Sequence, residues 1–564
     1  MTAPSEVLLS RADWVILITY LLAVAAIGLI ASRRVKDTSH FFLGSRGFNK
    51  WIMIAQSFGN GTHADMPVSL AGAVYVDGVP GIWYQWKNLF ATPFYWMIAP
   101  FFRRARRTTT AEILEDRYGS WMGTVYTGFA LAFFVIGMAG MLKGAGKVIG
   151  QALGAAIPVN AIVVAMTLVF VLYSFVGGLV ATAWTEVLQG MLIIVLSFLV
   201  IPMGWSLIGG LEGLRSTLGD NRLSLIAPEG IGPWFVFVLT INGLIGIVAQ
   251  PHIAATVGTG RSEQACREGM LYGNTVKRFC TIGWALIGLL TAALVAKGTF
   301  GVTHLQDPED TFGFACRHLL FPGGVGLLLA SLLATNMAGC SAFMVDSGAL
   351  FTRSFYQKFL VRGRSDRHYL WVGRISGVAI VATSALYAVF FIDRVLNTFL
   401  LTETMATYVG VTIFGGVMWP RATRWGALAA IVVAMATNFA VYSMRGERLD
   451  QWQPDAFLIA LGAGVAAFVV VSLATPAEQQ KRLDFFYGNL QTPVGGKPVP
   501  SREPGLDAAA NGDQLLFVNL PQLRKGAAGL GFLRAYRTDV RGFAVGWALV
   551  AVLIGSAWLI FSVL

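Results

Sequence analysis

The chain has 564 residues, of which 55% are hydrophobic and only 13% charged, and its mean hydropathy is +0.63. This composition excludes an ordinary soluble globular protein and indicates a polytopic membrane protein. The net charge of +12 does not indicate a nucleic-acid partner, because the lysines and arginines lie between apolar runs rather than on one basic face. The four cysteines show no CxxC spacing, so neither a metal site nor a disulfide framework is indicated.

Runs of about 20 apolar residues predict an all-α protein with about fourteen transmembrane helices. The first run is too long for a signal-peptide core and lacks a cleavage pattern, so we expect it to be retained. The predicted spans are residues 13–32, 51–75, 81–102, 120–148, 159–176, 179–208, 232–251, 279–297, 323–352, 372–392, 396–418, 426–444, 456–474 and 543–563.

Four basic connections set the predicted orientation, because all of them fall on the same side in this order of spans. They hold Arg33, Arg34, Lys36, Arg46 and Lys50; Arg103, Arg104, Arg106 and Arg107; Arg261, Arg267, Lys277 and Arg278; and Lys358, Arg362, Arg364 and Arg367. By the positive-inside rule this side is cytoplasmic. We therefore expect an integral protein of the plasma (cell inner) membrane with both termini outside.

Residues 475–541, between the last two spans, are rich in proline, glycine and polar residues and are predicted to be a mostly irregular cytoplasmic segment. Their second half, 515–537, interleaves apolar and basic residues. It is therefore either a simple linker or a segment that lies on the membrane surface.

The segment GNGTHADMP, residues 59–67, interrupts the second predicted span. Its glycines weaken a helix, Pro67 removes a backbone donor, and polar side chains including His63 and Asp65 fall at mid-membrane depth. Backbone freed from a helix in hydrocarbon is costly unless it lines a cavity. We interpret the segment as a binding site at the membrane midplane, of the kind that secondary transporters build from discontinuous helices; a glycine-rich packing kink is the alternative.

A second interrupted span occurs five spans later. Residues 234–250 carry Asn242, Gly243 and Gly246 near the centre and are followed directly by Pro251. Two irregular spans five apart predict an inverted repeat of five helices plus five, with both broken helices meeting at the midplane. The expected parts of the chain are residues 1–50 (first helix and loop), 51–230 and 231–420 (the two repeats), 421–474 (two additional helices), 475–542 (the cytoplasmic segment) and 543–564 (the last helix).

Three stretches resemble the solute:sodium symporter family, whose members transport sugars, proline, carboxylates and vitamins. Residues 37–46, DTSHFFLGSR, resemble that family's segment before the first core helix. Residues 174–190, SFVGGLVATAWTEVLQG, are similar to its glycine-glycine, tryptophan-threonine-acid, glutamine-glycine signature, and 250–253, QPHI, to a motif of the proline-transporting members. The resemblance extends from about residue 10 to 475. It implies the leucine-transporter-type fold, with the core helices at spans 2 to 11 and alternating access.

The resemblance also implies a coupling-ion site built from main-chain oxygens of Gly59, Thr62 and Thr335. Ala338 and Gly339 stand where sodium-coupled members present two adjacent hydroxyls. Sodium is a hard cation held by oxygens, so losing two of them should weaken the site severely. A sodium site shifted toward Ser341, coupling to protons, and no coupling at all remain open.

Proton coupling requires a buried carboxylate or imidazole that can bind a proton. The candidates are His63, Asp65, Asp346 and Glu186. Asp346 lies about two turns beyond Gly339 on nearly the same helix face. A structural ion pair between Asp346 and Arg353 is the alternative.

The expected substrate-binding residues are Asn60, His63, Asp65, Met66, Lys87 and Asn242. Asp65 falls at a position where, by the resemblance, sugar-transporting members contribute an amide or carboxylate. We expect Lys87 to pair with Asp65, and Glu403 to lie at the outer vestibule.

These observations predict an ion-coupled secondary transporter, a symporter, for a small polar organic solute. Its expected partners are the solute and the lipid bilayer, with Na⁺ or H⁺ as the coupling ion and no organic cofactor. The spans contain no HExxH motif and no GxSxG elbow with partners, which argues against an enzyme. The alternative function is a sensor that binds the solute on the same fold without moving it.

Overall fold

The computed structural model describes residues 9–32, 46–227, 230–449, 451–496, 513–523 and 534–562. The side chains of residues 24, 25, 27–32, 173–188, 338, 521–523 and 562 lie outside this description. The described residues form helices and no β-strand; an isolated bridge joins Phe48 and Gly260. The fold is therefore all-α, as predicted.

Helices occupy every predicted span. In the first half they are α1 (Arg11–Ser32), α3 (Lys50–Gly59), α4 (Asp65–Asp77), η2 (Val79–Ile82), α5 (Trp83–Trp86), α6 (Thr92–Ala105), α7 (Thr110–Tyr118), α8 (Ser120–Ala152), α9 (Val159–Leu199), α10 (Ile201–Ile208), α11 (Gly210–Leu218) and α12 (Asp220–Leu223). In the second half they are α13 (Pro233–Gly246), α14 (Pro251–Gly258), α15 (Glu263–Ala296), η3 (Pro308–Asp310), α16 (Thr311–Leu319), α17 (Gly324–Phe351), η4 (Thr352–Leu360), α18 (Asp366–Phe390), α19 (Val395–Met418), α20 (Arg424–Arg445), α21 (Pro454–Ala474), α22 (Gln480–Gln491), α24 (Leu516–Leu523) and α26 (Arg537–Ser562). Helix α9 contains the whole of the predicted span 159–176 and most of the predicted span 179–208.

Nine helices of the described chain are long and apolar enough to cross a membrane, and α13 with α14 makes a tenth span bent by 50°. Other predicted spans consist of shorter helices in series, such as α3 with α4 and α5 with α6. These short helices mark the places where the chain departs from a plain membrane-spanning helix. The structure confirms a polytopic helical membrane protein.

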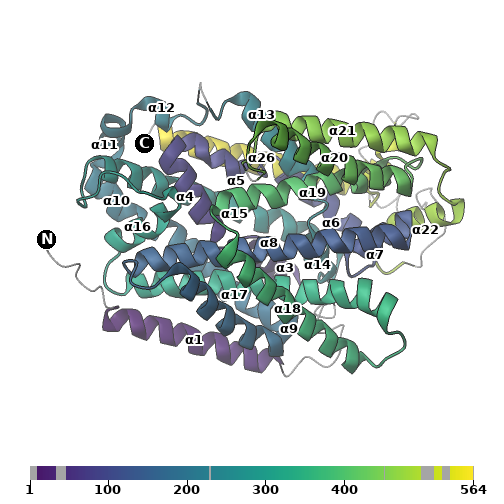
Figure 1. Cartoon of the computed structure of the whole chain (residues 1–564), viewed down its shortest axis with the longest axis horizontal. Coiled ribbons are helices and arrows are strands. Elements are labelled where there is room, and N and C mark those ends of the chain that lie inside the picture. The colour runs from purple at the N-terminus through teal and green to yellow at the C-terminus, as the bar shows by residue number, and fades with distance from the viewer. Residues whose placement is uncertain are drawn as a thin grey trace.

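The long helices run side by side along the long axis of the molecule (Figure 1). At one end lie α10, α11 and α16, and at the other lie α7 and α22. The start of α1 and the end of α26 lie at the same end, as an even number of spans requires. The side of the membrane that this end faces stays a prediction.

The segment predicted to be mostly irregular contains two helices, α22 and α24. The side chains of Leu483, Phe486 and Tyr487 in α22 are buried, and the Tyr487 hydroxyl donates to the carbonyl of Gly416 at 2.8 Å. In α24, Phe517 is buried and packs edge-on against Phe101 and Phe414. The described part of this segment therefore packs against the helix bundle; residues 524–533 of the predicted surface segment lie outside the described residues.

The third predicted basic connection is part of a helix. The side chain of Ser262 caps α15 by accepting from the amide of Ala265 at 3.2 Å, so the helix begins well before the predicted span 279–297. Arg267, Lys277 and Arg278 are consequently buried side chains of α15. These three residues do not belong to a loop, so they cannot support the predicted orientation of the chain in the membrane.

Candidate functional site

Two interrupted helices face each other near the centre of the fold. Residues 60–64 between α3 and α4 are not helical, and neither are residues 247–250 between α13 and α14. The second break lies just before Pro251 rather than at Asn242, because proline has no amide hydrogen to continue the helix. The Asn60 Nδ2 donates to Thr256 Oγ1 at 2.8 Å and links the two interrupted helices. Residues 59–67 are thus not a continuous helix, as predicted.

Groups released by the breaks find partners inside the protein. The carbonyl of Ala249 accepts from the hydroxyl of Tyr126 at 2.7 Å. The carbonyl of Asn60 lies 2.9 Å from Nε2 of His63. Unwound backbone is tolerated at membrane depth only with such partners or beside a cavity.

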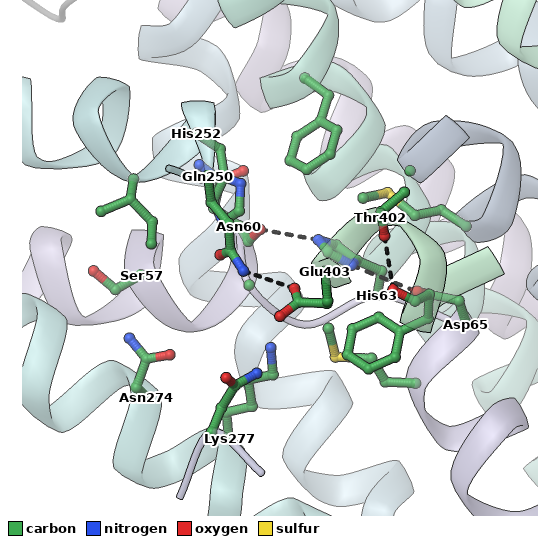
Figure 2. Close-up of a pocket in the computed structure, with 18 of the residues that line it drawn as sticks. Ser57, Asn60, His63, Asp65, Gln250, His252, Asn274, Lys277, Thr402 and Glu403 are labelled. Atoms are coloured by element: carbon green, nitrogen blue, oxygen red, sulfur yellow. Dashed lines mark hydrogen bonds and ion pairs between the residues drawn. The ribbon is translucent and has the colours of Figure 1, made fainter. Parts of the chain in front are cut away.

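A cavity lies between the two breaks, with about 810 Å³ of space not filled by atoms, part of which is open to solvent. Its walls also come from α8, α15, α17 and α19, which add the apolar side chains Phe133, Met141, Phe343 and Phe399. Its polar lining includes Ser57, Asn60, His63, Asp65, Gln250, His252, Asn274, Lys277, Thr402 and Glu403 (Figure 2). A concave space where aromatic side chains and converging polar groups meet is typical of a small-molecule site.

Four of the six predicted substrate-binding residues line this cavity, namely Asn60, His63, Asp65 and Met66. Lys87 and Asn242 lie behind its wall, where Lys87 Nζ donates to Asn242 Oδ1 at 2.9 Å. The predicted pair between Lys87 and Asp65 is wrong. Lys87 Nζ instead lies 3.4 Å from Oε2 of Glu403, and both side chains are buried.

Glu403 lies in the wall of the cavity and not at an outer vestibule. Its Oε1 accepts from Nε2 of Gln250 at 2.6 Å, and its Oε2 faces Lys87. The Glu403 carboxylate thus joins α19 both to Gln250 in the second break and to Lys87, the residue after α5. This position makes Glu403 a structural anchor of the cavity.

The ring of His63 occupies the space left by Gly339. A Cβ atom at Gly339 would lie 2.5 Å from Cδ2 of His63. The same ring places Nδ1 3.4 Å from Oδ1 of Asp65 and packs edge-on against Phe343 with centroids 5.8 Å apart. Glycine at 339 therefore leaves room for the imidazole of His63.

Three of the predicted ion-coupling residues lie close to the unwound segment. Thr62 and Thr335 line a second, smaller cavity of about 270 Å³ together with His63. The hydroxyl of Thr62 is buried and has no hydrogen-bond partner within the described chain, whereas that of Thr335 donates to the carbonyl of Ser331 at 2.7 Å. The carbonyl of Gly59 accepts from the amide of Thr62 at 3.3 Å.

Of the other predicted ion-coupling residues, Gly339 faces the His63 ring, and Ser341 and Asp346 lie further along α17. Ser341 is buried in α17, while the side chains of Ala338 and Glu186 are outside the described residues. Asp346 lines a third cavity of about 310 Å³ with Thr108, Thr109, Thr110 and Pro251. Its Oδ2 is buried and accepts no hydrogen bond within the described chain. Among the described ion pairs none joins Asp346 to Arg353.

Lys277, Asn274 and Thr402 line the cavity although the sequence analysis assigned them no role there. Lys277 is fourteen residues past the start of α15, which places it about 21 Å along the helix. The signal that could have located it is the capping pattern of Ser262 followed by an unbroken helical stretch. The positive-inside rule instead assigned this lysine to a loop.

A helical membrane protein whose two broken spans face each other across a buried polar cavity defines the class of secondary transporters. The chain belongs to the sodium:solute symporter family, whose model matches residues 41–434. It is similar to the osmoregulated proline transporter OpuE of Bacillus subtilis (strain 168), with 24% identity over 431 residues that cover 74% of this chain and 86% of that protein. It is also similar to the sodium/proline symporter of Escherichia coli (strain K12), with 24% identity over 500 residues that cover 82% and 94%.

The fold is similar to that of a solved Na⁺-coupled sialic acid symporter in a substrate-bound outward-open state. The TM-score is 0.71 at 18% identity, and the match covers 83% of this chain and 99% of that chain. The helical architecture predicted from the two interrupted spans is thereby confirmed.

Proposed function

We propose that this chain is an ion-coupled symporter that carries a small polar organic solute through the cavity between its two broken helices. The cavity itself is the main support for this proposal, because two unwound segments place polar groups around one shared space inside the helix bundle. Family membership supports a symporter. Asn60, His63, Asp65 and Met66 are the proposed solute contacts.

For the coupling ion we propose protons rather than sodium, carried by His63, Asp65, Asp346 and Glu186. The contact of His63 with Gly339 supports this, because the ring fills space next to the proposed sodium ligands. The unpaired Oδ2 of Asp346 also supports it. The cavity around Asp346 is lined by side chains from α8, α14, α17 and residues 108–110. These side chains carry hydroxyl groups or are apolar, and none of them adds a second charge.

Uptake into proteoliposomes under imposed gradients tests both parts of this proposal. We expect an inward proton gradient to drive uptake of the solute and a sodium gradient to have no effect. Asp346→Asn should abolish stimulation by the proton gradient while solute exchange across the membrane continues. Asp366→Asn, which changes an exposed carboxylate at the start of α18, is the matched control and should behave as the wild type.

Uptake that requires sodium and is indifferent to pH would contradict proton coupling. Solute binding without any exchange would instead favour a sensor. A sensor is the second candidate function because Gly339 departs from the pattern of sodium-coupled members.

A further inference from the structure

The charges around the cavity do not balance. Three cationic side chains, Lys87, Lys277 and Arg278, and two carboxylates, Asp65 and Glu403, lie in its wall or directly behind it. Leaving the two imidazoles aside, these side chains carry one positive charge in excess. A buried charge without a partner is costly, so this excess indicates a ligand of opposite sign.

The excess charge lies on Lys277 and Arg278, because neither forms an ion pair within the described chain and Nε of Arg278 is buried without an acceptor there. Lys87 is paired with Glu403, and Nη1 of Arg278 donates to the carbonyl of Gln85 at 3.2 Å. Lys277 is only 7% exposed, yet its ammonium makes no hydrogen bond and no ion pair with any residue of the described chain. Its ammonium is therefore a buried donor group that lines the cavity without a protein acceptor.

The ammonium of Lys277 lies beside the unwound segment. A Cβ atom at Gly61 would lie at ordinary contact distance, 3.7 Å, from Lys277 Nζ, so the ammonium lies directly beside the backbone of Gly61. Lys277 enters the cavity across from His252 (Figure 2). A solute bound between the two breaks would lie within reach of it.

We propose that the transported solute is an organic monoanion and that Lys277 binds its carboxylate. This inference rests on the proposed transport function and adds the substrate class. A charge-assisted hydrogen bond from the ammonium would satisfy the buried donor, and one negative charge would neutralise the cavity. A zwitterion would leave the excess charge in place. The apolar part of the anion would contact Phe343 and Phe399, which line the same space.

Binding to the purified full-length protein in detergent tests this proposal without any gradient. The probes are propionate and lactate, their neutral amides propionamide and lactamide, and the zwitterion proline. We expect the two carboxylates to raise the melting temperature and to bind measurably, and the amides and proline to bind at least about tenfold more weakly, the lower end of the range for a hydrogen bond to a charged group.

Lys277→Gln should weaken carboxylate binding by roughly 10- to 150-fold, the range for a lost charge-assisted hydrogen bond. Lys277→Arg should keep the preference for carboxylates over amides, because it keeps the charge. Lys143→Gln changes a lysine that donates to Asn160 at 3.1 Å outside this cavity, and it should leave binding unchanged. The comparison of carboxylate with amide in the wild type does not depend on whether the variants fold.

Equal binding of carboxylates and amides, preference for proline over the monoanions, or wild-type carboxylate affinity in Lys277→Gln would each overturn the proposal. Failure of the transport function is distinguishable from these results. Carboxylates that bind but are not exchanged across proteoliposomes contradict transport alone, whereas amides carried as well as carboxylates contradict the anion proposal alone.

Discussion

Glu403→Ala should lower the free energy of unfolding in detergent by about 3–5 kcal/mol, the cost of leaving a buried charge without its partner. The charge concerned is the ammonium of Lys87, which is fully buried and lies 3.4 Å from the Glu403 carboxylate. Its other contacts, the amide oxygen of Asn242 at 2.9 Å and the ring of Phe399, carry no compensating negative charge. Chemical denaturation followed by tryptophan fluorescence measures the change.

Two variants separate the ion pair from a general effect of truncation. The double variant Lys87→Met, Glu403→Leu removes both charges and should recover most of the lost stability. Asp393→Ala breaks an ion pair whose members are 67% and 58% exposed, and it should cost less than about 1 kcal/mol. If Glu403→Ala and Asp393→Ala destabilise the protein equally, the buried pair does not hold the cavity wall together.

Gly339→Ser should reduce solute uptake by roughly 5- to 150-fold, the equivalent of about 1–3 kcal/mol of overpacking. The serine Cβ would lie 2.5 Å from His63 Cδ2 and 3.2 Å from Sδ of Met141. To relieve this clash the imidazole has to leave the Asn60 carbonyl and the Asp65 carboxylate that it now contacts. Uptake and solute affinity, measured on the same protein preparation, give the size of the loss.

The matched control is Gly128→Ser, because a Cβ at Gly128 in α8 meets no atom within 4 Å. Removing the His63 ring should reverse the loss of uptake that serine at position 339 causes. In the triple variant His63→Ala, Ala338→Ser, Gly339→Ser, two hydroxyls are introduced while the His63 ring is absent, and we expect sodium to stimulate uptake. Wild-type uptake by Gly339→Ser alone would show that the His63 ring has no part in the site.

The sequence was sufficient to locate both helix breaks, because glycine and proline act locally. Residues 59–67 and Pro251 disrupt helical hydrogen bonding whatever surrounds them. From this spacing the inverted repeat followed, and Asn60, His63, Asp65 and Met66, which were predicted to face the site, line the cavity.

Side-chain partners across the fold could not be predicted in the same way. Lys87 pairs with Glu403 rather than with Asp65 because α19 packs beside the second break, which no local pattern encodes. The structural effect of glycine at position 339 depends on where the His63 ring lies. Lys277 was misplaced because a basic residue near an apolar run is read as a loop signal, although a helix start at Glu263 carries it deep into the bundle.

Reactivity of a cysteine at residue 57 toward a membrane-impermeant maleimide tests the central claim that this cavity opens in turn to the two sides of the membrane. Ser57 lines the cavity, and the four native cysteines are fully buried, so Ser57→Cys adds one reactive thiol. We expect it to be labelled from either face of oriented vesicles and protected when solute is bound. A thiol that reacts from neither face, or from one face only whatever solute or gradient is applied, would contradict transport through this cavity.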